Sequence, residues 1–128
     1  MGNDGFTLIE LLAVIIILAI VAIISTPIIL NVVNDARMSA AEAKAWGTIE
    51  AVDSKYKQDT LSGVVGVGEY NVDFTESGNS KNVKIRGIGP TGGAVKVSAD
   101  GLVTCKDLTF DNYKCSSSNG TGMTCTKQ

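Results

Sequence analysis

The chain has no histidine among its 128 residues, and it has only two prolines, three cysteines and one tryptophan. Without histidine it lacks the commonest general base and metal ligand of proteins. No nucleophile–base pair and no metal-ligand spacing is visible among the other residues, so we expect neither an enzyme nor a metal or cofactor site. A formal net charge of −2 argues against a general nucleic-acid-binding domain, because such domains tend to be basic.

Charge is also scarce in the N-terminal part of the chain. The segment Gly5–Pro27 reads GFTLIELLAVIIILAIVAIISTP, and its single charged residue is Glu10. As a helix, Phe6–Leu30 is long enough to cross about 30 Å of hydrocarbon. An ionised glutamate in that setting costs several kcal/mol and persists mainly where function requires it. We therefore expect a membrane-spanning helix in which Glu10 has a specific partner.

Two simpler interpretations of this segment are a secretory signal peptide and an ordinary single-pass anchor. A signal peptide has an apolar core of about 7 to 15 residues followed by a small-x-small cleavage site. Here the unbroken apolar run from Leu11 to Ile24 leads to Ser-Thr-Pro and then to more helical sequence. A plain anchor has the right length but offers no use for Glu10.

The string Gly-Phe-Thr-Leu-Ile-Glu before a long apolar helix resembles the type IV pilin family, and Pro27 also matches that family's pattern. The resemblance covers roughly residues 5 to 37. It implies that a prepilin peptidase cuts between Gly5 and Phe6 and methylates the new amine of Phe6. It also implies that Glu10 accepts this amine from a neighbouring copy during assembly, and that the helix loosens at Pro27. The five residues before the cut contain an acid and no Lys or Arg, unlike the usual basic leaders of the family.

The resemblance implies a structural subunit of a type IV pilus-like extracellular filament, a homo-oligomer polymerised through its N-terminal helix. The precursor would cross the cytoplasmic membrane once, and an assembly ATPase and a membrane platform protein would be further partners. One alternative is a pseudopilin of a type II secretion or competence (DNA-uptake) system. Another, from a different class, is a membrane-anchored binding module such as an adhesin or a DNA receptor. The sequence leaves these three open.

The helical pattern continues beyond Pro27, because no further proline occurs before position 90. At about 100° per residue, two stripes run along it. We expect the stripe of larger residues to pack on a sheet of the same subunit, and the stripe of small residues to let another helix approach closely. The first stripe comprises Met38, Ala41, Ala45, Ile49, Val52 and Tyr56, and the second comprises Ile29, Ala36, Ala40, Ala43 and Gly47.

We predict a helix from about Phe6 to Gln58 and three parts of the chain. These are a leader peptide at residues 1–5, a membrane and polymerisation segment at 6–35, and a globular head at 36–128 that includes the second half of the helix.

After Leu61 the pattern changes to that of strands and turns. A turn is predicted at Ala99–Gly101, and one further short strand is predicted across Leu108–Phe110 and Tyr113–Cys115. Alternation predicts other strands at Tyr70–Phe74, Val83–Arg86, Ala94–Ser98 and Leu102–Cys105. The predicted fold class is α+β with an antiparallel sheet of three or four strands. The packing of this sheet on the second half of the helix is what the pilin resemblance implies.

The three cysteines, Cys105, Cys115 and Cys125, lie in the last quarter of the chain. Because we expect this part to be exported to an oxidising exterior, one disulfide is plausible and one thiol is left over. Three pairings remain open. We favour Cys115–Cys125, which would close a loop rich in Ser and Gly, as pilins of the Gram-negative type often do.

Basic residues cluster in the predicted sheet. Lys84, Arg86 and Lys96 are expected on its outward face with Lys81 nearby, which makes DNA a conceivable partner. Binding of single strands would need interleaved aromatic residues, and none lie there. We therefore favour a solvated sheet face over DNA contact.

Overall fold

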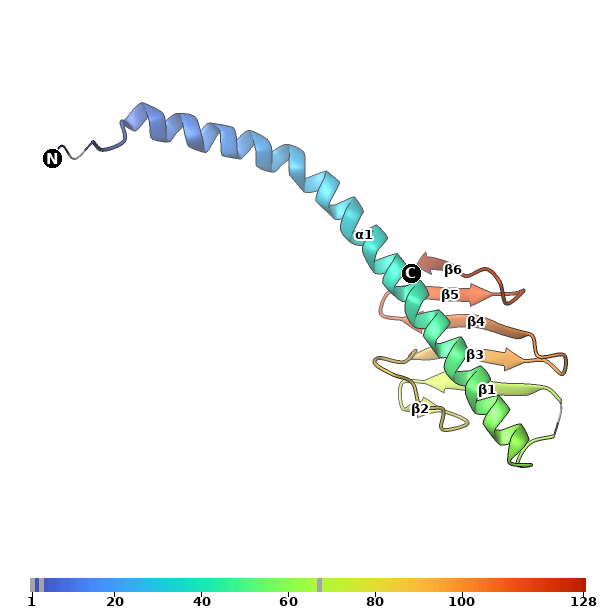
Figure 1. Cartoon of the computed structure of the whole chain (residues 1–128). Coiled ribbons are helices and arrows are strands. Elements are labelled where there is room, and N and C mark those ends of the chain that lie inside the picture. The colour runs from blue at the N-terminus through green and yellow to red at the C-terminus, as the bar shows by residue number, and fades with distance from the viewer. Residues whose placement is uncertain (1, 3, 67) are drawn as a thin grey trace. The chain divides into compact units, whose positions relative to one another are not determined.

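The computed structural model describes residue 2, residues 4–66 and residues 68–128 of the chain. These residues form one long helix followed by six strands (Figure 1). The elements are α1 Leu8–Leu61, β1 Tyr70–Thr75, β2 Gly78–Asn79, β3 Gly92–Val97, β4 Val103–Phe110, β5 Tyr113–Ser117 and β6 Thr124–Lys127.

The chain divides into two compact units, Met1–Ala36 and Arg37–Gln128. The N-terminal part of α1 makes up most of the first unit. The C-terminal part of α1 and the six strands make up the second unit, which we call the head. The predicted helix agrees with α1 to within three residues at each end.

The head is a single antiparallel sheet with α1 packed on one of its faces. The strand order is β2-β1-β3-β4-β5-β6, and each neighbouring pair is antiparallel. Side chains alternate along β1, where Tyr70, Val72 and Phe74 are buried. They share one core with the larger-residue stripe of α1, in which Ala45 and Val52 are fully buried. The α+β fold class and the packing stripe predicted from the sequence are therefore confirmed.

The sheet has six strands where three or four were predicted. Leu108–Phe110 ends β4 and Tyr113–Cys115 lies in β5, so two strands occur where one was expected. Strand β2 has two residues and β6 has four, and neither was predicted. Such short edge strands carry too little alternation to be recognised.

The predicted strand Val83–Arg86 is wrong, because this segment is irregular. The side chain of Asn79 accepts a hydrogen bond from the Val83 amide at 2.7 Å and donates one to the Val83 carbonyl at 3.0 Å. Both backbone groups are thus satisfied without a neighbouring strand. Val83 is buried in the core nonetheless, which explains the apolar alternation.

Candidate functional site

The predicted processing region ends in a hydrogen-bonded cap on α1. The Thr7 amide donates to Oε2 of Glu10 at 2.9 Å, and the Glu10 amide donates to Oγ1 of Thr7 at 3.3 Å. This reciprocal pair is a capping box, which satisfies two amides that the first turn of a helix leaves without partners. Glu10 therefore has a local structural role within one chain.

The capping box bears on why a glutamate occurs in this apolar segment. A plain membrane anchor can also use Glu10, as a cap, so its presence does not by itself require a partner from another copy. The pattern Thr-x-x-Glu at positions 7 to 10 is visible in the sequence and predicts the cap. Both capping residues follow the predicted cut between Gly5 and Phe6, so the cap remains in a chain that begins at Phe6.

The N-terminal part of α1 exposes an unusually long apolar surface. Exposed fractions of its large apolar side chains run from 39 % at Val33 to 89 % at Leu8. Contiguous apolar patches above a few hundred Å² are rare on soluble monomers and mark contact with a membrane or another protein. This stretch is long and apolar enough to cross a membrane.

The small-residue stripe is exposed in the part of the chain that the structure describes. All five of its members are exposed, and a Cβ built on Gly47 would meet nothing within 4 Å. The contact with another helix that the stripe predicts remains a prediction.

Pro27 lies inside α1, which continues through it. Proline has no amide hydrogen, so it cannot donate the usual helix bond to the carbonyl of Ile23. One residue earlier, the Thr26 hydroxyl donates to the Ala22 carbonyl at 2.7 Å. The turn before Pro27 thus lacks one backbone bond, which is the physical basis for expecting a weak point there.

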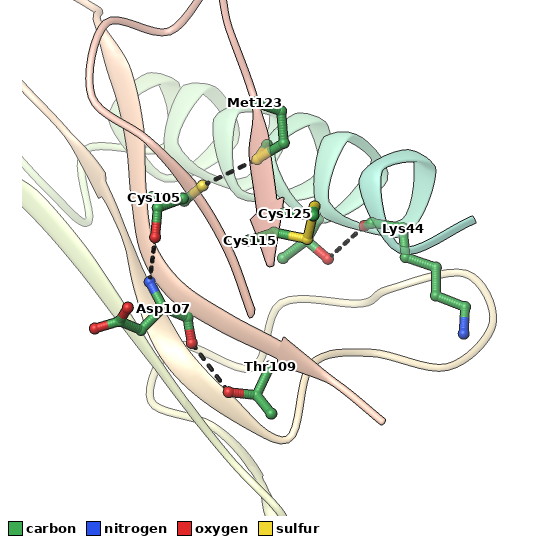
Figure 2. Close-up of a disulfide and its surroundings, with 9 residues drawn as sticks. Lys44, Cys105, Asp107, Thr109, Cys115, Met123 and Cys125 are labelled. Atoms are coloured by element: carbon green, nitrogen blue, oxygen red, sulfur yellow. Dashed lines mark hydrogen bonds between the residues drawn. A yellow bond between two sulfur atoms is a disulfide. The ribbon is translucent and has the colours of Figure 1, made fainter. Parts of the chain in front are cut away.

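In the head, Cys115 and Cys125 form a disulfide between the paired strands β5 and β6. This is the favoured pairing among the three. Cys105 is a free and buried thiol, and Figure 2 shows its sulfur directed toward Met123, 3.8 Å from Sδ. Burial raises the pKa of the Cys105 thiol above its ordinary value, which makes it a poor nucleophile.

The basic residues do not form the sheet-face patch expected from the sequence. Lys96 lies on β3 and pairs with Glu69 at 2.8 Å, whereas Lys84 and Arg86 lie in the loop before β3, near α1. The expectation of one shared face fails because Val83–Arg86 is not a strand. Within the described ranges, no group of three or more Cys, Asp or Glu residues is arranged to hold a metal ion.

Comparison with known proteins matches the N-terminal segment alone. Residues 1–26 match the family model of the prokaryotic N-terminal methylation motif. Neither the curated proteins nor the solved structures include a match to the chain. The motif implies processing by a prepilin peptidase, and the exposed apolar helix behind it fits a membrane-anchored precursor. The chain therefore carries the N-terminal methylation signal of type IV pilins and pseudopilins.

Proposed function

We propose that the chain is a structural subunit of a type IV pilus-like filament. The precursor crosses the cytoplasmic membrane once, a prepilin peptidase cuts it between Gly5 and Phe6, and the mature chain polymerises through α1. An assembly ATPase and a membrane platform protein drive this step. The chain itself performs no catalysis.

The observation that carries this proposal is the processing motif directly in front of an apolar helix that the chain leaves uncovered. Inside a membrane, lipid covers that surface. Outside, the same surface must be buried against other copies, because exposed apolar area of this size is strongly unfavourable in water. A filament with the N-terminal helices at its centre meets this requirement.

Glu10 has a second role in this proposal, beside its role in the cap. Cleavage creates a positive amine on Phe6, and an unpaired charge in the apolar centre of a filament is costly. The carboxylate of Glu10 on one copy pairs with the Phe6 amine of its neighbour, so the two charges neutralise each other. The Thr7 amide uses Oε2 of Glu10, and a carboxylate oxygen accepts more than one hydrogen bond.

Two single substitutions separate the effect of the capping box on assembly from the effect of the Glu10 charge. Glu10→Gln keeps a side chain that can complete a capping box but removes the charge. Thr7→Ala removes the hydroxyl of the cap but keeps the charge. We expect Glu10→Gln to insert in the membrane yet give no sheared filaments, whereas Thr7→Ala still assembles.

Wild-type filament yield from Glu10→Gln would refute the charge pairing. Loss of filaments from Thr7→Ala together with normal filaments from Glu10→Gln would show that Glu10 acts in assembly through the cap alone.

A further inference from the structure

The loop that joins β5 to β6, residues 118–123, contains an asparagine that the proposed function does not use (Figure 1). Asn119 is exposed, and it is the only asparagine of the chain that is followed by glycine. The Cys115–Cys125 disulfide closes this loop. On the folded head, Asn119–Thr121 help to line a hollow beside Trp46. The β5–β6 loop therefore holds an Asn-Gly pair at a defined place on the surface of the head.

Glycine after an asparagine favours a reaction between the two residues. The side-chain amide carbon of an asparagine, Cγ, can be attacked by the backbone nitrogen of the next residue. Gly120 has no Cβ, so no side chain hinders the approach of its nitrogen to Cγ of Asn119. The Gly120 amide also donates no hydrogen bond to any residue within the described ranges. Its nitrogen is therefore available as the attacking atom.

The hydrogen bonds of the Asn119 side chain favour the same reaction. Its Oδ1 atom accepts hydrogen bonds from the amides of Thr121 at 3.3 Å and Gly122 at 3.2 Å. These bonds draw electron density toward Oδ1 and make Cγ a better electrophile. The Nδ2 group, which can donate two hydrogen bonds, donates none to the residues that the structure describes. The group that must leave is thus held only by solvent.

Asn79, which is followed by Ser80, is held in the opposite way. Its Oδ1 accepts a hydrogen bond from the Val83 amide at 2.7 Å, and its Nδ2 donates to the Val83 carbonyl at 3.0 Å. Loss of Nδ2 would break the second bond and leave the carbonyl of a buried residue without its partner. The fold therefore protects Asn79.

Asp100–Gly101 in the head can form the same kind of ring but is also protected. The Gly101 amide donates to the Ser98 carbonyl at 2.9 Å, so its nitrogen is already engaged. The Ser98 hydroxyl bonds to the Asp100 carboxylate and lowers its pKa, which keeps the side chain ionised and a poor electrophile.

We propose that Asn119 is a site of spontaneous deamidation in the folded head. The Gly120 nitrogen loses its proton to solvent and bonds to Cγ of Asn119, and Nδ2 leaves as ammonia. Water then opens the cyclic imide at either of its two carbonyls. One opening gives aspartate, and the other gives isoaspartate, which carries an additional methylene in the backbone. The net reaction consumes water, releases ammonia and involves no oxidation.

Either product changes the surface of the head. A new carboxylate joins those of Glu50 and Asp53, which line the same hollow. Isoaspartate also lengthens a loop that has little room, because a Cβ added to Gly120 would lie 2.9 Å from Cδ1 of Leu102. We therefore expect converted chains to carry a more acidic and displaced β5–β6 loop. This inference does not depend on the proposed filament function.

Mass spectrometry of the full chain can test the proposal. The folded chain is incubated in detergent at mildly alkaline pH, and samples are then reduced and digested with trypsin. Cleavage after Lys114 and Lys127 gives a peptide, residues 115–127, in which Asn119 is the only amide side chain. We expect this peptide to gain the mass difference between an amide and an acid and to separate into aspartate and isoaspartate forms.

The peptide of residues 58–81 contains Asn79 and is the internal control. It should keep its amides over the time in which Asn119 is converted. A second control is Asn119→Gln, whose longer side chain cannot form the same ring and should give no product in residues 115–127. An unchanged Asn119 in the incubated folded chain would overturn the proposal. Equal conversion of Asn119 and Asn79, or conversion of Asn119 only after unfolding, would also overturn it.

Discussion

The hydroxyl of Tyr70 donates a hydrogen bond of 2.8 Å to Oδ2 of Asp59, joining the last turn of α1 to β1. Lys55, one turn earlier on the helix, binds Oδ1 of the same carboxylate at 2.6 Å. The ring of Tyr70 packs against Tyr56, with 5.4 Å between the centroids. These contacts fix the end of the helix to the sheet within the head.

The pair of Asp59 and Tyr70 predicts a pH window for the stability of the head. The hydrogen bonds from Lys55 and Tyr70 lower the pKa of Asp59 below 3.8. The stabilisation of the head by the ionised Asp59 carboxylate is therefore present above pH 3.8, and it is lost as the pH falls through the folded-state pKa. Burial and the bond to Asp59 raise the pKa of Tyr70 from 10.0 to about 12. The stabilisation of the head by the protonated Tyr70 hydroxyl is therefore complete below pH 10 and is lost as the pH rises toward 12.

The free energy of unfolding can be measured across this pH window by titrating the full chain in detergent with denaturant at each pH. Near-ultraviolet circular dichroism follows the unfolding. We expect Tyr70→Phe to lower stability near neutral pH and to weaken the alkaline decline between pH 10 and about 12. An unchanged alkaline decline in that variant would mean that other groups cause it.

Leu108 provides a test of the core. Its side chain is fully buried on β4 at the interface with α1. We expect Leu108→Ala to reduce the free energy of unfolding by about 2–5 kcal/mol, because it leaves a cavity. The matched control is Leu61→Ala at a site that is 89 % exposed, where the change should stay within about 0.5 kcal/mol. Similar losses in chemical denaturation of the two variants would contradict the described core.

Gly93 occupies a position that other residues cannot. Its φ is +97°, and an added Cβ would lie 2.4 Å from the carbonyl oxygen of Asp107 in the neighbouring strand, where the β3–β4 register shifts. Gly63 has a φ of +70° but open space around it, so Gly63→Ala should cost only the backbone strain of about 1–2 kcal/mol. We expect Gly93→Ala to lower the melting temperature at least twice as much as Gly63→Ala. Equal effects would show that strand β4 moves freely aside.

Thiol counting tests the disulfide. Without reductant, we expect the unfolded chain to titrate one thiol, that of Cys105, and the reduced chain to titrate three. In the folded chain Cys105 should react slowly with alkylating reagents, because it is buried and its pKa is raised. Three thiols in the unreduced chain would exclude the Cys115–Cys125 bond.

The sequence predicted the parts of the fold that depend on periodic apolar residues. The stripe on α1 that includes Ala45 and Val52 was identified because an apolar face recurs at the helical period and must be buried. The alternation at Val83–Ile85 was misleading, since the apolar positions reflect burial in a loop whose backbone bonds come from the side chain of Asn79. A side-chain bond of this kind leaves no periodic signal.

The candidate site was predictable to a similar extent. The motif at Gly5–Glu10 predicts cleavage by a prepilin peptidase. The same six residues include Thr7 and Glu10, whose spacing predicts the capping box. The hollow beside Trp46 was not predictable. It joins residues of α1 to the loops at Leu102 and Asn119–Thr121, far apart in the sequence, and only the folded sheet brings them together.

The proposed function requires that the chain is cut between Gly5 and Phe6 and assembled outside the cell. Both steps can be checked by the intact mass of the chain in filaments sheared from its host, taken without reduction. We expect a chain that begins at methylated Phe6 and lacks two thiol hydrogens. A chain that still begins at Met1 and occurs only in the membrane fraction would contradict the proposed function and leave α1 as a plain anchor.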